Sequence, residues 1–372
     1  MNDPRDLLLT LNAARGIARA AACRLALELD RWWPPERPDD EAAAEIGVPR
    51  PALRQARALA CKARAFAAAE REKAAVLGAR VITRLDPDYP RAALAPLDLP
   101  PPVLFVLGRL PAPEQPAAAL VGSRLADLYG REVATLLGRE LAAAGVVVVS
   151  GFAVGIDAAA HRGALSDTGI VPPGGPPVTL GVLGSGLGTD YPRGHRELGA
   201  AIARRGGLLS EFPCGAQPRP WRFPVRNRLI AALSQATVVV RATPRSGSLV
   251  TARLALEIGR EVLAVPGRIF DDLSKGPNDL IADGARPVLA SRDVLEALGL
   301  SLVAKAPPPE PALEGLVGRL FRRLPVADPV TAEDLAGELG EPVETVLGAL
   351  LELELLGRVR RQPGMAYSRG VA

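Results

Sequence analysis

Short apolar runs alternate with amphipathic helical patterns through the middle of this chain. Six such runs have the length and branched-residue content of buried strands, and each of the first five is followed by a turn or loop and then by a helical pattern. This order predicts an α/β fold, a parallel sheet with helices on both faces and with ligands over the carboxyl ends of the strands. The predicted strands are Ala118 to Val121, Val146 to Val149, Thr179 to Leu183, Gly207 to Ser210, Val238 to Arg241 and Val262 to Val265.

Further segments flank this pattern. Residues 1–75, rich in Ala, Leu and Arg at helical spacing, predict a helical N-terminal domain, either similar to a SAM or helix-hairpin-helix domain or a plain packing domain. Residues 76–300 form the sheet domain, which opens with a proline-rich connection and a strand at Val103 to Leu107. Residues 301–312 predict a stiff proline-rich linker that separates a third domain.

The tail, residues 313–372, predicts a winged helix. Three helical runs precede a basic segment and a glycine turn, which together predict a two-stranded wing. Thr331 and Asp334 have the spacing of an N-cap pair at the start of the second helix. Winged helices bind DNA or serve as protein contacts, and because the second and third helices are acidic, both alternatives stay open.

Composition narrows the classes of function. The chain has 372 residues, enough for two or three domains, and a net charge of +4, which fits a nucleic-acid partner without requiring one. Its three cysteines have no paired spacing, so we expect a reducing compartment and neither disulfide nor zinc site. We find no signal segment and no apolar run long enough for a membrane span, and we expect a cytoplasmic protein. With only His161 and His195, most metal-site and catalytic-triad chemistry is excluded.

Charge is one-sided in one segment. Between Phe212 and Leu256 there are seven arginines and no Asp or Glu. Like charges without a counter-charge repel one another, so this segment predicts an anionic partner rather than only a solvated face. Two polar signals within it, at residues 223–228 and 245–248, each precede a helical run, and helix N-termini beside arginines bind phosphate.

Polar or glycine-rich turns follow the predicted strands. The glycine patterns lack an acidic ribose-binding residue at the usual spacing, which disfavours a dinucleotide site, and there is no P-loop pattern of an ATPase. Asp157 is expected to cap a helix or anchor a turn, while His161 and Glu211 are expected to be structural. The rings of Phe223 and Trp221, set among arginines, offer stacking surfaces for unpaired bases; core packing is the alternative for both rings, and for Trp221 above all.

Taken in order, these turns resemble the DNA-processing protein A (DprA/Smf) family. Seven matching pieces cover about residues 117 to 290, and together they are far more specific than any single glycine loop. They are Val121 to Arg124, Ser150-Gly151 with Gly155 to Asp157 and Ala160-His161, Gly184 to Gly186 with Tyr191-Pro192, Ser210 to Pro213, Phe223-Pro224 with Arg226 to Arg228, Arg245 to Ser248 with Thr251-Ala252, and Val265 to Gly267.

The resemblance implies an extended Rossmann-like fold that binds single-stranded DNA, forms a homodimer and loads the RecA recombinase on incoming strands during natural transformation. It implies no enzymatic activity, catalytic residue, metal or cofactor, and no membrane partner. We expect phosphates to be held by Arg124, Arg226 and Arg228, with Arg193 and Arg245 nearby. The full set of candidate DNA contacts is Gly122, Ser123, Arg124, Gly151, Arg193, Phe223, Arg226, Asn227, Arg228, Arg245, Ser246, Gly247, Ser248 and Thr251.

Two positions depart from the family pattern. Val154 stands where an arginine usually precedes Gly-Ile-Asp, and Arg241 where the family often has an acidic or small residue, so a compensating exchange of charge between these turns is one interpretation. Two other functions stay open: a nucleotide-binding module, or a hydrolase of nucleotide N-glycosidic bonds. Residues 173–175 match the Pro-Gly-Gly start of a hydrolase turn, but Pro176-Pro177 follows and the segment precedes a strand, which argues against that chemistry.

Overall fold

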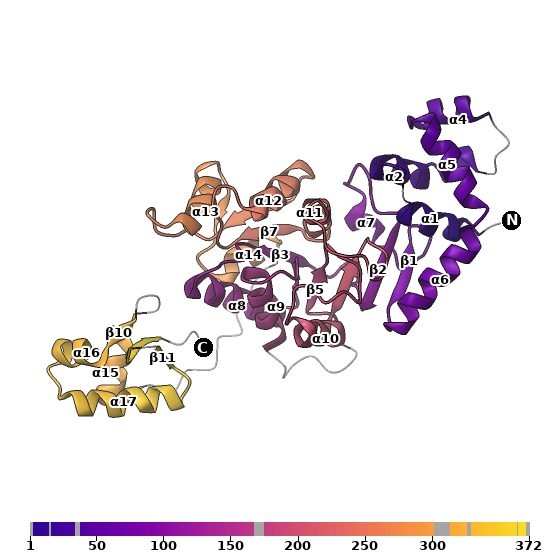
Figure 1. Cartoon of the computed structure of the whole chain (residues 1–372). Coiled ribbons are helices and arrows are strands. Elements are labelled where there is room, and N and C mark those ends of the chain that lie inside the picture. The colour runs from indigo at the N-terminus through magenta and orange to yellow at the C-terminus, as the bar shows by residue number, and fades with distance from the viewer. Residues whose placement is uncertain are drawn as a thin grey trace. The chain divides into compact units, whose positions relative to one another are not determined.

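Two compact units make up the chain in the computed structural model (Figure 1). The structure describes residues 3–14, 16–33, 38–166, 175–300, 313–325, 329–362 and 364–369. One unit contains residues up to 126 together with 133–300, and the other contains residues 127–132 together with the C-terminal segment. The predicted linker, residues 301–312, and the Pro173-Gly174 pair lie outside the described residues, and the domain boundaries expected at residues 75 and 300 stay predictions.

A nine-stranded sheet forms the centre of the larger unit, in the order β1-β2-β6-β5-β4-β3-β7-β8-β9. The strands from β3 to β9 are parallel to one another, whereas β1 and β2 are antiparallel additions beside β6. The α/β fold with a mostly parallel sheet is therefore confirmed. The strands are β1 (Arg80–Thr83), β2 (Val103–Gly108), β3 (Ala117–Val121), β4 (Val147–Ser150), β5 (Thr179–Val182), β6 (Gly207–Ser210), β7 (Ala236–Val239), β8 (Glu261–Ala264) and β9 (Arg286–Pro287).

Helices cover both faces of this sheet because its central strands are apolar on both sides. In β3, Ala118 and Leu120 pack into one core, while Ala117, Ala119 and Val121 pack into the other. The first core includes α8 (Leu128–Ala143), α9 (Ile156–Ser166) and α14 (Ser291–Ala297), and α10 (Arg196–Arg205) packs beside α9. The second includes α7 (Arg91–Leu94), α11 (Arg222–Ala232) and α12 (Gly247–Glu257). Helix α13 (Asp272–Ala282) packs beside β8.

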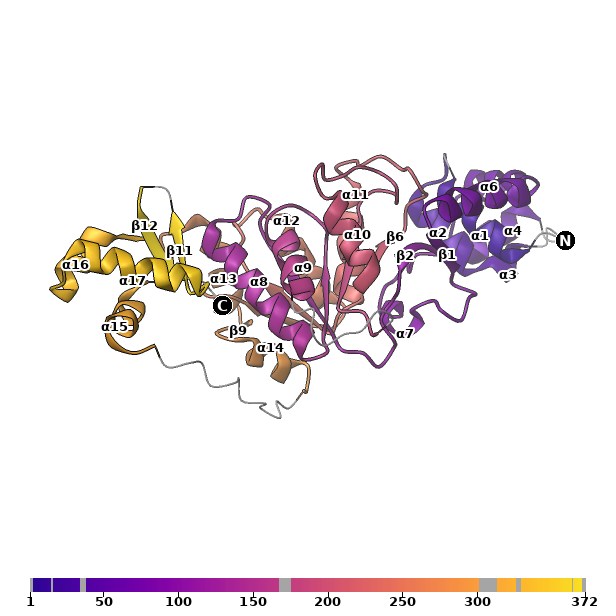
Figure 2. The same ribbon diagram turned by 90° about the horizontal axis from the view of Figure 1, so that it is seen from below.

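The N-terminal helices share a hydrophobic core with the sheet. Leu7, Leu8 and Leu25 are buried in the same cluster as Phe105 of β2 and Phe152 of the turn after β4. Contacts between residues group these helices with the sheet as one compact unit. They are α1 (Pro4–Ala13), α2 (Arg19–Leu27), α3 (Leu29–Trp32), α4 (Asp39–Ile46), α5 (Arg50–Ala60) and α6 (Ala63–Val76), seen from a second direction in Figure 2.

The smaller unit has the predicted winged-helix fold. Thr331 caps its second helix as expected, since its hydroxyl accepts a hydrogen bond from the Asp334 N–H at 3.1 Å. A short strand, β10 (Val330–Thr331), completes a three-stranded sheet with the two strands of the wing. The elements are α15 (Gly315–Arg323), α16 (Ala332–Leu339), α17 (Val343–Leu355), β11 (Val359–Gln362) and β12 (Ala366–Arg369).

Within the described residues, no helix combines the length and the apolar character that crossing a membrane requires.

Candidate functional site

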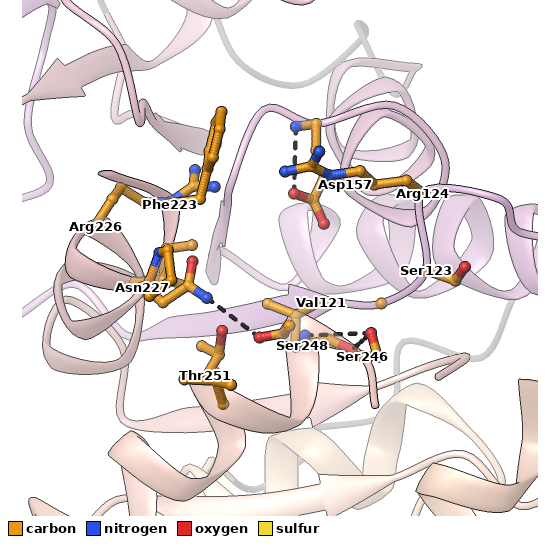
Figure 3. Close-up of a pocket in the computed structure, with 16 residues that line it drawn as sticks. Val121, Ser123, Arg124, Asp157, Phe223, Arg226, Asn227, Ser246, Ser248 and Thr251 are labelled. Atoms are coloured by element: carbon orange, nitrogen blue, oxygen red, sulfur yellow. Dashed lines mark hydrogen bonds between the residues drawn. The ribbon is translucent and has the colours of Figure 1, made fainter. Parts of the chain in front are cut away.

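A pocket of about 290 Å³ opens at the carboxyl ends of β3 and β7 (Figure 3). The chain builds β4, β5 and β6 on one side of β3, and then β7, β8 and β9 on the other. A reversal of strand order leaves a crevice where successive connections leave the sheet in opposite directions, and ligands bind there in open α/β sheets. The lining residues come from the end of β3, from the turns after β3, β4 and β7, and from helices α9, α11 and α12.

The first turn directs one arginine into this pocket. A Cβ on Gly122 would lie 2.6 Å from Ile156 Cγ1, so only glycine allows this close approach of the turn to α9. Ser123 is fixed, because its N–H donates to the Arg241 carbonyl at 2.6 Å and its hydroxyl accepts from the Leu125 N–H at 3.1 Å. The next residue, Arg124, is exposed, and its guanidinium carbon lies 4.9 Å from the centroid of the Phe223 ring.

Phe223 presents a partly exposed ring at the first turn of α11. The ring packs tightly on Gly184, where a Cβ would lie 2.6 Å from Phe223 Cδ1. The Tyr191 ring lies 5.6 Å away between centroids, tilted by 39°. These contacts and the Arg124 guanidinium hold the Phe223 ring at the rim of the pocket, where a planar ligand can stack on it.

Helix α12 begins at the same pocket. Ser246 is its N-cap, and the Ser246 hydroxyl accepts from the Ser248 N–H at 3.3 Å and contacts the Ser248 hydroxyl at 2.7 Å. The Asn227 side chain donates to the Gly247 carbonyl at 3.2 Å, which ties α11 to this turn (Figure 3). A Cβ at Gly247 would meet nothing within 4 Å. The positive end of the helix dipole therefore faces open space, which favours an anion.

Arg226 lies at the floor of the pocket rather than at its rim. It is only 4% exposed, and one guanidinium nitrogen donates to the carbonyls of Gly151 and Val182. Burial lowers the pKa of Arg226 to about 10. This placement corrects our expectation that Arg226 offers its guanidinium to a phosphate, because in this structure the side chain ties the ends of β4 and β5 together.

Asp157 accompanies Arg226 at the floor. Its carboxylate accepts from the Ala153 N–H at 3.2 Å, so it anchors the second turn, as expected (Figure 3). Burial raises the pKa of Asp157, while the guanidinium of Arg226 acts in the opposite direction. Beneath the pocket, the buried carboxylate and the buried guanidinium thus each favour the charged form of the other.

Arg228 does not reach the pocket. Its guanidinium forms an ion pair with Glu211, whose side chain is fully buried, and donates to the Leu99 carbonyl at 2.8 Å. Glu211 also pairs with Arg19, and its carbonyl accepts from the Asn12 side chain at 2.9 Å. Glu211 is therefore structural, as expected, whereas our placement of Arg228 among the phosphate contacts is corrected by its ion pair with a buried carboxylate.

Arg241 has no part in the pocket either. It is 4% exposed, and its guanidinium pairs with Asp271 and donates to the Ser274 hydroxyl. The compensating exchange of charge that we considered between Val154 and Arg241 is therefore not what the structure shows. Arg241 instead joins the end of β7 to the start of α13, and Val154 is 40% exposed.

The pocket brings together ten of the fourteen candidate contacts. They are Gly122, Ser123, Arg124, Phe223, Arg226, Asn227, Ser246, Gly247, Ser248 and Thr251, the last of these buried. Gly151 lines a smaller adjoining hollow. Arg193 and Arg245 are exposed on neighbouring loops.

Sequence reasoning missed some of the lining. Tyr191 lines the two hollows beside the pocket and supports the Phe223 ring, and its place shortly after the Gly184 to Gly186 turn was the signal that could have identified this role. Val250 and Ile230 line the pocket from α12 and α11, and nothing in their sequence context distinguishes them from core residues.

Comparisons with known proteins agree with the fold and with the order of the turns. Residues 80–299 match the family model described as DNA recombination-mediator protein A, and residues 304–365 match the DprA winged helix domain. The chain is 43% identical to Protein Smf of Escherichia coli over 284 residues, which cover 74% of each protein. It is 40% identical to DNA processing protein DprA of Bacillus subtilis over 54% of this chain and 65% of that protein.

Two solved structures are also similar. The X-ray structure of DNA processing protein A from Streptococcus pneumoniae has a TM-score of 0.65 at 32% identity and covers 80% of this chain and 98% of that one. A structure of DNA processing protein A from Helicobacter pylori has a TM-score of 0.50 at 28% identity, over 59% and 95% respectively. The latter is described as giving insight into that protein's single-stranded DNA binding mode.

Proposed function

The chain belongs to the DNA-processing protein A family, and from that premise we propose that it binds single-stranded DNA along the carboxyl edge of its sheet. We further propose that it acts without catalysis in the cytoplasm, as a homodimer that protects incoming strands and loads the RecA recombinase. The binding of single strands by the Helicobacter pylori relative supports the first part. The recombinase and the dimer follow only from the family premise.

One observation carries the proposal: the Arg124 guanidinium lies over the Phe223 ring beside the open N-terminus of α12. A nucleotide has an anionic phosphate and a flat base, and this edge offers a binding group for each. Arg124 and the α12 terminus favour phosphate, while the Phe223 ring offers a stacking surface. The exposed Arg193 and Arg245 add positive charge along the same edge.

Neither kind of contact distinguishes one base from another. Phosphate contacts carry no sequence information, and every base has a face that can stack on an aromatic ring. We therefore expect binding that tolerates any sequence and weakens with salt, with a slope of about −0.7 in log K against log salt for each phosphate neutralised.

Fluorescence anisotropy with a labelled 30-nucleotide poly-dT strand tests the site. We expect Phe223→Ala and Arg124→Ala to weaken binding, whereas Arg253→Ala, which removes an exposed arginine of α12 that does not line the pocket, leaves it within about twofold. Equal affinity of all four proteins would reject this site. If a mononucleotide competed with the strand at concentrations near the dissociation constant of the strand, the protein would be a nucleotide-binding module. Release of a free base would indicate a nucleotide-hydrolysing protein.

Light scattering after gel filtration, with and without the same strand, tests the assembly. A mass of twice 38.9 kDa without DNA would support the homodimer. Recombinase loading is tested separately, by whether the protein speeds RecA filament formation on a strand already covered by single-strand-binding protein. No acceleration would reject that part of the proposal while leaving strand binding intact.

A further inference from the structure

Trp221 is half-exposed close to the pocket, and it is not one of the residues of the proposed site. We propose that Trp221, with Arg219 and Arg222, forms a second base-stacking subsite, which extends the strand path from Phe223 toward the N-terminal helices. This inference rests on the proposed binding of single-stranded DNA and adds a specific contact to it.

The ring of Trp221 is held in place although 49% of the residue is exposed. It is the N-cap of α11, and its ring meets Phe212 edge to face, with centroids 6.0 Å apart and planes at 85°. The Arg222 guanidinium carbon lies 5.3 Å from the Trp221 ring centroid and 4.7 Å from that of Phe212. A large ring that is fixed and yet half-exposed can accept a stacked base with little loss of side-chain entropy.

Positive charge surrounds this ring without matching negative charge. Among the described residues, no carboxylate lies within ion-pairing distance of Arg219 or Arg222, and Arg19 shares the buried Glu211 with Arg228. Burial lowers the pKa of Arg222, and the nearby charges of Arg219 and Arg19 lower it further. A phosphate placed among these guanidinium groups would relieve their mutual repulsion.

The subsite is continuous with the pocket. A shallow hollow joins them, lined by Arg124, Tyr191, Pro218, Arg219, Pro220 and Phe223. Arg219 therefore lines a surface shared with Phe223 and lies two residues before Trp221, at the turn where the Arg222 N–H donates to the Arg219 carbonyl at 2.9 Å. A strand stacked on Phe223 can follow this hollow as far as Arg219, and Trp221 is the next aromatic residue along the same turn.

Nucleic acid fits this surface better than a protein partner does. Trp221 is its one large exposed apolar side chain among the described residues of the segment from Phe212 to Phe223, and the side chains around it are cationic. A protein interface usually has a larger apolar centre. A nucleic-acid base, in contrast, can bind to a single exposed aromatic ring flanked by guanidinium groups.

The experiment compares Trp221→Ala and Trp221→Phe with the wild-type full-length chain. Two 20-nucleotide ligands are used at fixed salt: labelled poly-dT, and a labelled base-free strand with the same sugar-phosphate backbone. We expect Trp221→Ala to weaken poly-dT binding about 5- to 50-fold, and Trp221→Phe to restore most of it. On the base-free strand the three proteins should bind within about twofold of one another.

Tryptophan fluorescence gives a direct readout. Poly-dT should quench the emission of the wild-type chain but hardly that of Trp221→Phe, because the other two tryptophans lie away from the subsite in the N-terminal core, Trp32 buried and Trp33 partly buried. As a charge-matched pair, Arg219→Ala should weaken binding more than Arg253→Ala, since Arg219 lines the hollow and Arg253 does not.

The outcomes separate the two proposals. If Trp221→Ala binds poly-dT as tightly as the wild type while Phe223→Ala does not, the subsite is wrong and the pocket stands. If the wild type itself fails to bind poly-dT, the proposed function fails first. If Trp221→Ala retains DNA affinity and loses only a protein partner, the surface is a protein interface, and the stacking subsite is likewise overturned.

Discussion

Arginines at the rim of the pocket and arginines beneath it differ in what surrounds them, although both kinds come from segments that meet at the same edge of the sheet. Arg124 is exposed and lies over the Phe223 ring. Arg226 and Arg228, three and five residues after Phe223, are bound to buried carbonyls and to a buried carboxylate. The same side chain thus offers its charge to a ligand at one place and holds strand ends together at the other.

This difference teaches that the number of arginines in a segment of sequence does not tell how much positive charge the folded protein exposes to a partner. Of the seven arginines between Phe212 and Leu256, Arg226 and Arg241 are buried, Arg228 is ion-paired and Arg222 is partly buried, while Arg219, Arg245 and Arg253 are exposed. Glu211, one residue before the segment begins, neutralises part of it. Four substitutions or conditions test the contrast.

Arg226→Ala should have the largest effect, on stability. It removes the hydrogen bonds to the Gly151 and Val182 carbonyls and leaves the buried Asp157 without its nearby positive charge. Removing one partner of a buried charge pair costs about 3–5 kcal/mol in the free energy of unfolding. Urea denaturation measures this, with Arg253→Ala as the control. If Arg226→Ala kept the stability of the wild type and lost affinity for DNA, Arg226 would be a DNA contact and not a structural residue.

Glu211→Gln should have a somewhat smaller effect. The amide keeps the shape of the side chain but loses the charge that pairs with Arg19 and Arg228. Hydrogen bonds to charged groups contribute about 1.5–3 kcal/mol each, so a loss of about 2–3 kcal/mol in the free energy of unfolding is expected. The same denaturation assay applies. An unchanged free energy of unfolding would mean that Glu211 does not hold Arg228 and that Arg228 is available to a ligand.

Acid should destabilise the region beneath the site. Burial, followed by the charges of His195 and Arg226, lowers the pKa of His161 to about 3, from 6.5 when unfolded. Between these values the unfolded chain binds a proton that the folded chain does not, so stability is full above about pH 6.5 and falls below it, by about 1.4 kcal/mol per pH unit. Between pH 6.5 and pH 5 we expect a loss of about 2 kcal/mol. Denaturation midpoints that stay constant over this range would contradict a neutral His161.

Arg124→Ala should have the smallest effect, and on binding alone. Losing one phosphate contact and the cation over Phe223 is expected to weaken poly-dT binding about 5- to 10-fold and to make the salt slope shallower by about 0.7. The denaturation midpoint should not change, because the side chain is exposed. If Arg124→Ala instead lost stability and kept its affinity for poly-dT, Arg124 would be a structural residue and not a DNA contact.

The strands were readable from sequence because each central strand is buried on both faces. The bounds of the predicted and observed strands differ by no more than two residues. The predicted strand 118–121, for example, coincides with the last four residues of β3. The edge strand Arg80–Thr83 was missed, since its run of strand-favouring residues, 81–83, is short and its antiparallel pairing with β2 defines it. Local patterns do not report on a partner strand more than twenty residues away.

The site was only partly readable for a similar reason. The spacing of glycines and polar residues identified the turns, and the order of strands then gathers those turns at one edge. Whether an arginine points outward depends on acceptors from distant segments. The carbonyl that binds Arg226 is 44 residues away at Val182, and the one that binds Arg228 is 129 residues away at Leu99.

The core shared by the N-terminal helices and the sheet limits how the protein can be divided. Cutting the chain before β1 would leave apolar side chains such as Phe105 and Phe152 without their cover, and Phe152 belongs to the turn that lines the edge of the site. A fragment from residue 80 to 300 would then tend to aggregate in solution. Calorimetry of the unit that ends at residue 300 should accordingly show a single melting peak.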